Sequence, residues 1–337
     1  MSRFRALRDF AKAHPRLMMA AQLGVLAVFF GAIGWALRGS FHDAANDLRD
    51  ADPVLFLLAC VAVAAYYLVF VLGWQWLFRS WDIRFSYGVS LRVEMVSMLA
   101  KYVPGAIWTP AARVVAMRRA GVTNGALVTA AMVIEAGISA VAGVLVFVVS
   151  LAWVNGVDAP TVPLVAFAIA VTVLLYPRIF QPLASRVLRR FGYAELPPVR
   201  ASTMLTLLVF YCATWVIGGV GLWLLVRSFG AHPGVSAIVF LGGTAAVGAI
   251  VAVLSVFAPS GLGPREASMY GLMTAIVSDG AALGATVLNR VAITLVEVLL
   301  LVVGGLLLRR GEVEDQSARA TASRQPATSA ETSSSGS

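Results

Sequence analysis

The chain has 337 residues, of which 59% are hydrophobic and only 13% are charged, and its formal net charge is +9. A water-soluble domain of this size carries about a quarter charged residues, so the composition excludes that class. The apolar runs are long and unbroken, whereas membrane barrel strands alternate with a period of two. We therefore predict an all-α polytopic membrane protein. Most of the basic residues lie beside apolar runs, as the positive-inside rule requires, so nucleic-acid binding is not expected.

Neither the cysteines nor the histidines form a recognisable site. Cys60 and Cys212 fall inside apolar runs, which favours core packing over a disulfide framework. His14, His42 and His232 are scattered in flanks and loops, which argues against a zinc site. We expect no metal, no cofactor and no catalytic residue.

The chain begins with a basic segment, residues 1–16, which is expected to lie in the cytoplasm. The first apolar run, Leu17–Leu37, is long enough to cross a bilayer at about 1.5 Å per residue. It is longer than the apolar core of a cleaved signal peptide, so we predict an uncleaved span. The acid-leaning loop Arg38–Asp52 is placed outside, and Pro53–Phe78 returns the chain to the cytoplasm.

The next stretch, Tyr87–Gly121, is ambiguous because it carries six charged residues and is broken by prolines. Its helical pieces, about Tyr87–Val103 and Pro110–Ala120, are short for a span. They either cross the membrane as a pair or re-enter it. Asn124 has the residue type of a helix N-cap and is predicted to open a span to about Val154.

The chain then crosses back and forth again. Thr161–Tyr176 leads inward to the basic segment Pro177–Arg200, which is predicted to be cytoplasmic. Ala201–Val226 leads outward and Val235–Ala258 returns. The broken segment Pro259–Ser278 follows, and it either spans or re-enters.

Asp279 is a second candidate N-cap, and the span that it opens is predicted to reach Leu308. Residues 311–337 are rich in Ser, Thr, Ala and Glu, a composition that cannot bury enough apolar surface to fold. We predict a disordered cytoplasmic tail there. The membrane domain is accordingly residues 17–310, with about seven to eight spans that include short broken or re-entrant helices.

The sequence contains an internal repeat. A shift of 155 positions lays Val122–Glu135 on Val277–Arg290 without a gap and puts Pro104 on Pro259. A basic pair precedes the first of these spans, whereas a basic pair follows the second, so the two spans are predicted to run in opposite directions. Such an inverted repeat places transporter substrate sites near the midplane, beside broken helices.

Two lone ionisable residues, Glu135 and Arg290, lie near the middle of the matching spans. Each is 11 residues past its N-cap candidate, or about 16 Å along a helix axis. A charge that faced lipid there would cost roughly 2.5–3.5 kcal/mol. The simplest expectation is a salt bridge or a polar cluster across the repeat axis, extended by Glu297 two turns beyond Arg290. Such a pair either fixes the register of the helices or lines a transport path.

Two broken motifs flank these charges, KYVPGAIW at Lys101–Trp108 and PSGLGPRE at Pro259–Glu266. Proline removes a backbone donor and glycine permits unusual dihedral angles, and lipid cannot satisfy the freed backbone groups. An arginine at the second break can hold a phosphate; the plainer interpretation is a cytoplasmic loop with snorkelling arginines. The predicted helix breaks are at Pro104, Gly105, Pro259, Gly261 and Gly263. The candidate substrate-binding residues are Lys101, Arg113, Glu135, Arg265, Glu266, Arg290 and Glu297.

At these motifs the chain resembles the lysylphosphatidylglycerol synthase transmembrane (flippase-like) family. The similar residues are KYVPGAIW with the following RRAGV, and APSGLGPRE with the later NR, and the resemblance covers roughly residues 17–310. It implies a multi-pass bacterial inner-membrane protein that moves a phospholipid or lipid-linked precursor between leaflets. The aminoacyltransferase domain of some members is not found in this sequence, so lipid aminoacylation and other enzymatic activity are not expected.

The expected partners are membrane lipids and, among proteins, a lipid-modifying enzyme or a glycosyltransferase. One alternative is a non-catalytic membrane subunit or scaffold for such a system, which would need no charge in mid-membrane. Another is an intramembrane enzyme that acts on a lipid-linked sugar. The enzyme would need paired aspartates at a membrane surface, whereas the aspartates before Pro53 have the pattern of a solvated face.

Overall fold

The computed structural model describes residues 51–100, 108–154, 161–190, 197–255 and 261–322, and within these ranges the regular structure is entirely helical. The helices are α3 (Pro53–Arg79), α4 (Tyr87–Ala100), α5 (Trp108–Arg119), α6 (Gly125–Ser150), α7 (Thr161–Leu175), α8 (Pro177–Arg190), α9 (Ala201–Ser228), α10 (Ala237–Leu254), α11 (Pro264–Met273) and α12 (Asp279–Ala322). The sequence-based predictions for Leu17–Leu37, Lys101, Pro104, Gly105 and Pro259 lie outside the described residues.

Five of the described helices are long and apolar enough to cross a membrane: α3, α6, α9, α10 and the part of α12 from Asp279 to Val303. A sixth span results if α7 and the start of α8, which are bent by 68° relative to each other, are counted together. The protein is thus an all-α polytopic membrane protein, as the composition predicts. Helices α4, α5 and α11 have 14, 12 and 10 residues, so each is too short to cross at 1.5 Å per residue.

Local capping explains where several helices begin. The Asp52 carboxylate accepts hydrogen bonds from the backbone amides of Val54, at 2.8 Å, and Leu55, at 3.2 Å. The Asn124 side chain accepts one from the amide of Leu127 at 3.1 Å, which confirms its predicted role. The same prediction for Asp279 is wrong by one position, because α12 already begins at Asp279. An acidic residue in the first helical turn is favoured by the helix dipole.

Replacing Asn124 with alanine should lower the stability of the protein by about 1 kcal/mol, because one amide at the start of α6 loses its acceptor. The measurement is thermal unfolding of the full chain in detergent, followed by tryptophan fluorescence. Thr123→Ala is the matched control, since Thr123 is the exposed neighbour. Equal melting of both variants and the wild type would contradict a contribution from the cap.

Helix α12 continues well past the predicted end of the membrane domain. It runs to Ala322, so the first part of the predicted disordered tail, residues 311–322, is helical. The prediction of disorder considered only the apolar surface that this segment can bury, and helix propensity also matters. Glu, Gln, Ala and Arg are good helix formers, and a helix that is already nucleated extends through such residues at little cost.

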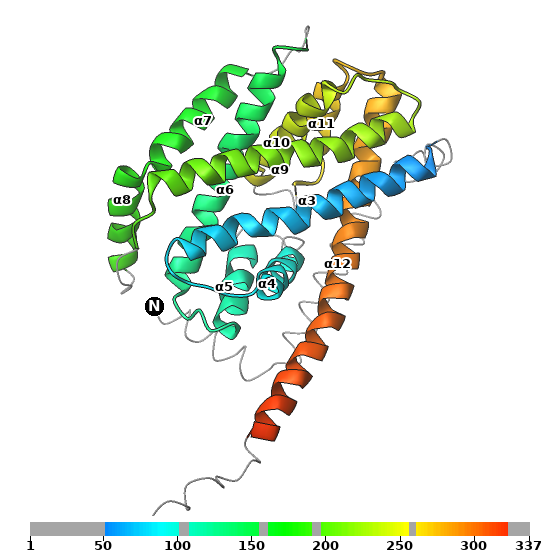
Figure 1. Ribbon diagram of the computed structural model, residues 1–337. Helices are drawn as coiled ribbons and strands as arrows, with labels where there is room; N and C mark the ends of the chain where they lie inside the picture. The colour runs from blue at the N-terminus through cyan, green and yellow to red at the C-terminus, as the bar shows by residue number, and fades with distance from the viewer. Residues whose placement is uncertain (1–50, 101–107, 155–160, 191–196, 256–260, 323–337) are drawn as a thin grey trace, which may run out of the picture.

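The helices repeat in order and in packing. In the first half α3, α4, α5 and α6 follow one another, and α9, α10, α11 and α12 do so in the second. Helix α6 packs against α9 and α10 of the other half, as α12 packs against α3 and α4. In Figure 1, α6 rises through the view while α12 descends, and α3 and α9 lie side by side in opposite directions. This arrangement agrees with the predicted inverted repeat, with α7 and α8 inserted between the halves.

Glycines bring the central helices into close contact. A Cβ atom added at Gly219 of α9 would lie 2.2 Å from the carbonyl oxygen of Ile238 and 2.7 Å from the amide nitrogen of Gly242. A Cβ at Gly243 of α10 would lie 2.5 Å from the Cα of Phe147 in α6. Small residues allow such backbone approach between membrane helices. The contact fixes α10 against both α6 and α9, the helices that carry part of the site described next.

Candidate functional site

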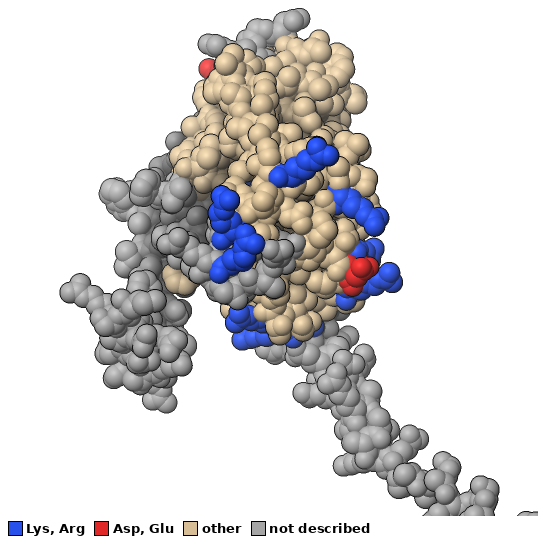
Figure 2. Space-filling view, turned by 90° about the vertical axis from the view of Figure 1, so that its left-hand side faces the viewer, with Lys and Arg blue, Asp and Glu red and all other residues tan. Residues whose placement is uncertain are grey.

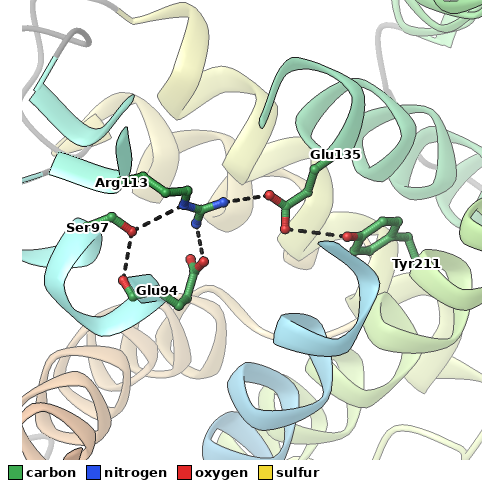
Figure 3. Close-up of polar contacts among 5 residues, drawn as sticks. All are labelled: Glu94, Ser97, Arg113, Glu135 and Tyr211. Carbon is green, nitrogen blue, oxygen red and sulfur yellow. Dashed lines mark hydrogen bonds and ion pairs between the residues drawn. The ribbon is translucent and has the colours of Figure 1, made fainter. Parts of the chain in front are cut away.

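Arg113 of α5 is the centre of a buried polar cluster (Figure 3). Its Nη1 donates to Glu135 of α6 at 2.7 Å, and its Nη2 donates to Glu94 of α4. Its Nε donates to the hydroxyl of Ser97 at 3.4 Å, and the hydroxyl of Tyr211 lies 3.4 Å from the second oxygen of Glu135. We call these five residues the arginine cluster. In this cluster one guanidinium binds two carboxylates, and each of its two terminal nitrogens donates to a different one.

The arginine cluster is shielded from solvent by both halves of the protein. Arg113, Glu94 and Glu135 are each 5% exposed, and Tyr211 is fully buried. The guanidinium carbon of Arg113 lies 5.5 Å from the ring centre of Trp74. Because Tyr211 belongs to α9, the second half of the chain contributes directly to a charge network of the first half. Removing Arg113 would leave two buried carboxylates without their cation, which is strongly destabilising.

A second group of polar contacts lies on α11 and α12. Arg290 pairs with Glu266 at 3.4 Å, and the other carboxylate oxygen of Glu266 accepts from the amide of Gly263 at 2.8 Å. Glu297 is 1% exposed and accepts a hydrogen bond from the hydroxyl of Tyr67 in α3. We call Tyr67, Glu266, Arg290 and Glu297 the second cluster. It also joins the two halves, since α3 belongs to the first.

The two clusters are built on corresponding helices with the charges exchanged. In the first half, the cation is on the short helix α5 and its carboxylate Glu135 is on α6. In the second half, the carboxylate Glu266 is on the short helix α11 and its cation Arg290 is on α12. In both cases a tyrosine from the first helix of the opposite half reaches a glutamate on the long helix. The repeat therefore extends from the backbone to the polar contacts.

We predicted a salt bridge or a polar cluster for Glu135 and Arg290, and of these two forms the direct salt bridge is wrong. Glu135 pairs with Arg113, and Arg290 pairs with Glu266. Each long helix is contacted by the short helix that precedes it in its own half, and that neighbour supplies the opposite charge. Arg113 and Glu266 were candidates from the sequence, but their partners depend on how the short helices pack.

Arg265 differs from the other arginines of the predicted site. Its side chain is half-buried, and its stem lies against α10, where a Cβ at Gly248 would be 3.3 Å from its Cγ. The guanidinium is within electrostatic range of the hydroxyls of Tyr66 and Tyr67. Among the described residues, no carboxylate pairs with it, whereas Arg113 and Arg290 each have one.

The break before α11 positions Arg265 and Glu266. Gly261 and Gly263 have φ values of +68° and +88°, a region that side chains rarely adopt. A Cβ at Gly261 would also lie 2.2 Å from the Cβ of Ala252. Both predicted break residues therefore need glycine, and the tight turn directs the first turn of α11 toward α10 and α12.

Sequence reasoning missed several members of the site, namely Tyr66, Tyr67, Trp74, Glu94, Ser97 and Tyr211. Glu94 was hidden among the many charges of the ambiguous Tyr87–Gly121 stretch. The sequence did contain a signal for the tyrosines, because a hydroxyl inside an apolar span needs a hydrogen-bond partner. No group of His, Cys, Asp and Glu in the described ranges has the geometry to hold a metal ion.

Comparison with known proteins places this arrangement in a family. No curated protein matches the chain. Residues 22–320 match the family described as the lysylphosphatidylglycerol synthase TM region. The match covers most of the chain, including every helix of both clusters, and it links the protein to lipid handling. The chain is a multi-pass membrane protein that belongs to the lysylphosphatidylglycerol synthase TM region family.

Proposed function

We propose that the protein is a flippase-like transporter that moves a phospholipid or lipid-linked precursor between the leaflets of a membrane. The observation that carries the proposal is Arg265, a half-buried cation without a carboxylate partner in the described residues, whose chain neighbour Glu266 belongs to the second cluster. A lipid must carry a charged head group through the membrane while its tails stay in hydrocarbon. A polar site between the halves, with an available cation, suits this task.

The chemistry of Arg265 fits a phosphate. A guanidinium presents donors that match two phosphate oxygens at once. Arg265 also lies in the first turn of α11, where the helix dipole favours an anion. The hydroxyl of Tyr66 can donate a hydrogen bond to the same head group, whereas the Tyr67 hydroxyl already donates to Glu297. In this proposal the phosphate binds Arg265 and no chemical bond is made or broken.

In this proposal the two clusters have different roles. The arginine cluster is deeply buried, its Arg113–Glu135 ion pair is at 2.7 Å, and Tyr211 links it to the second half, so it holds the halves together. The Arg290–Glu266 pair is longer, at 3.4 Å, and its side chains are 19% and 25% exposed. Such a pair separates at lower cost than a fully buried one. We propose that it opens to admit the phosphate beside Arg265 and closes behind it.

We further propose that the protein lies in a bacterial inner membrane with both termini in the cytoplasm. In Figure 2, arginines of the described residues gather on the lower part of the face and are missing from its upper part. Exposed arginines of the described chain occur after α3, at the end of α5 and on α8. The positive-inside rule assigns this end of the molecule to the cytoplasm. The described part of α12 also extends toward this end in Figure 1.

The proposal is tested by reconstituting the full chain in vesicles and measuring the movement of fluorescent lipids between leaflets. The probes are labelled phosphatidylglycerol, phosphatidylethanolamine and a polyprenyl phosphate. Arg265→Gln should slow the transported probe roughly tenfold or more, since a charge-assisted hydrogen bond is worth about 1.5–3 kcal/mol. Arg118→Gln, which removes an exposed arginine from the end of α5, should leave the rate unchanged.

Two outcomes would count against transport through this site. If Arg265→Gln moves the probe as fast as the wild type, the phosphate does not use Arg265. If the wild type moves none of the three probes faster than empty vesicles, the transport function itself fails. The second result favours the alternative role, a membrane subunit for a lipid-modifying enzyme or glycosyltransferase.

A further inference from the structure

An apolar groove opens between α6, α7 and α9, and none of its lining residues belongs to either charge cluster. Its volume is about 280 Å³, and its lining is hydrocarbon apart from Thr172 and Tyr176. Leu175 and Pro177 line it where α7 meets α8, and Leu205 lines it from α9. The groove therefore lies along candidate membrane-spanning helices and ends at the bend between α7 and α8.

Helix α8 is an amphipathic helix with a basic face. It turns by 68° from α7, and it carries Ile179, Phe180 and Leu183 together with Arg178 and several further arginines. Ile179 and Leu183 are 43% and 44% exposed. A helix with this pattern lies in the plane of the membrane surface, with its apolar side toward the acyl chains and its arginines at the head groups. The groove thus opens at the depth of the head groups.

Two arginines lie at the mouth of the groove. Arg178 directly follows the lining residue Pro177, and Arg200 directly precedes the lining residue Ala201. Chain neighbours have Cα atoms about 3.8 Å apart, so the backbone of both arginines lies beside the lining of the groove, and both side chains are exposed. An apolar groove with cations at one end is complementary to a molecule with an apolar chain and an anionic head.

We propose that one anionic phospholipid binds at the bend between α7 and α8, with an acyl chain in the groove and its phosphate at Arg178 and Arg200. The lipid comes from the leaflet on the basic side of the protein. Val173, Leu174 and Leu205 beside the groove are 52%, 45% and 62% exposed, as expected for side chains that contact the bilayer. This site uses other helices than the Arg265 site, so it goes beyond the proposed transport and does not depend on it.

The test is native mass spectrometry of the full chain, purified in detergent and titrated with lipid. The wild type should retain one phosphatidylglycerol and bind it at least roughly tenfold more tightly than phosphatidylcholine with the same chains, because charge-assisted hydrogen bonds to phosphate are worth about 1.5–3 kcal/mol each. Arg178→Gln with Arg200→Gln should remove this preference. Leu205→Trp, which fills the groove from an exposed position, should weaken retention of both lipids.

Matched controls distinguish lipid binding at this site from non-specific electrostatic attraction between anionic lipids and exposed arginines. Arg84→Gln with Arg118→Gln removes the same charge from exposed positions elsewhere and should not change retention. Soluble glycerol phosphate should not displace the bound lipid, since it has no chain for the groove. Equal retention of both lipids by the wild type, loss in the control pair, or wild-type retention in both site variants would overturn the proposal. Arg265→Gln should keep the lipid at this bend, so failure of transport and failure of this site are distinguishable.

Discussion

Replacing Arg113 with methionine should prevent stable folding, with a loss of about 3–5 kcal/mol. The change leaves Glu94 and Glu135 buried beside each other after their shared cation is removed. Arg113→Lys should lie between this variant and the wild type, because a single ammonium cannot bind two carboxylates in the fixed geometry of a guanidinium. The measurements are the yield of monodisperse protein and its melting temperature in detergent.

The control for this prediction is a variant in which all three charged residues of the arginine cluster are replaced by neutral ones. A triple variant with Arg113→Met, Glu94→Gln and Glu135→Gln contains no buried charge at this position, so much of the lost stability should return. Arg118→Met, an exposed change on the same helix, should be nearly neutral. A single variant as stable as the wild type, or a triple variant no better than the single, would contradict the role given to the cluster.

The same triple variant tests whether the arginine cluster only holds the helices together or also takes part in transport. If it folds and still moves lipid in vesicles, the arginine cluster serves only to hold α4, α5 and α6 together. If it folds and moves none, the cluster belongs to the transport path.

Replacing Gly219 with alanine should separate α9 from α10 and destabilise the protein by about 1–3 kcal/mol or more, the range for overpacking a well-packed core. The added Cβ would meet backbone atoms of Ile238 and Gly242, at 2.2 and 2.7 Å. Backbone atoms cannot move aside as a side chain can, so the helices themselves must shift. The measurement is the change in melting temperature of the full chain in detergent.

Gly218 offers a matched control on the same helix. A Cβ there would meet only the ring of Tyr66 at 3.6 Å, which is an ordinary contact, so Gly218→Ala should be tolerated. Gly271→Ala on α11 meets nothing within 4 Å and should be neutral or up to about 1 kcal/mol stabilising through helix propensity. Similar melting of the Gly218 and Gly219 variants would show that the close approach of α9 and α10 is not needed.

The sequence by itself determined the class of the protein, the main spans and the repeat. These features are local, because the length of an apolar run sets whether it crosses a membrane and a side chain such as Asn124 caps its own helix. The sequence also singled out Glu135 and Arg290, since a charge is costly inside any apolar span. The tail predicted from the sequence begins too early, at residue 311. Residues with high helix propensity extend α12 beyond that point to Ala322, even without apolar burial.

Only the tertiary structure decided which charges pair. Arg113 and Glu94 are 19 positions apart, and Tyr67 and Glu297 are 230 apart, so no spacing rule connects them. Short helices α5 and α11 pack against the long helices of their own halves and bring Arg113 and Glu266 to Glu135 and Arg290. Glycines such as Gly219 and Gly243 likewise bring α10 into close contact with α9 and α6. Such packing is a property of surfaces that meet in the folded protein, which apolar length and charge count do not specify.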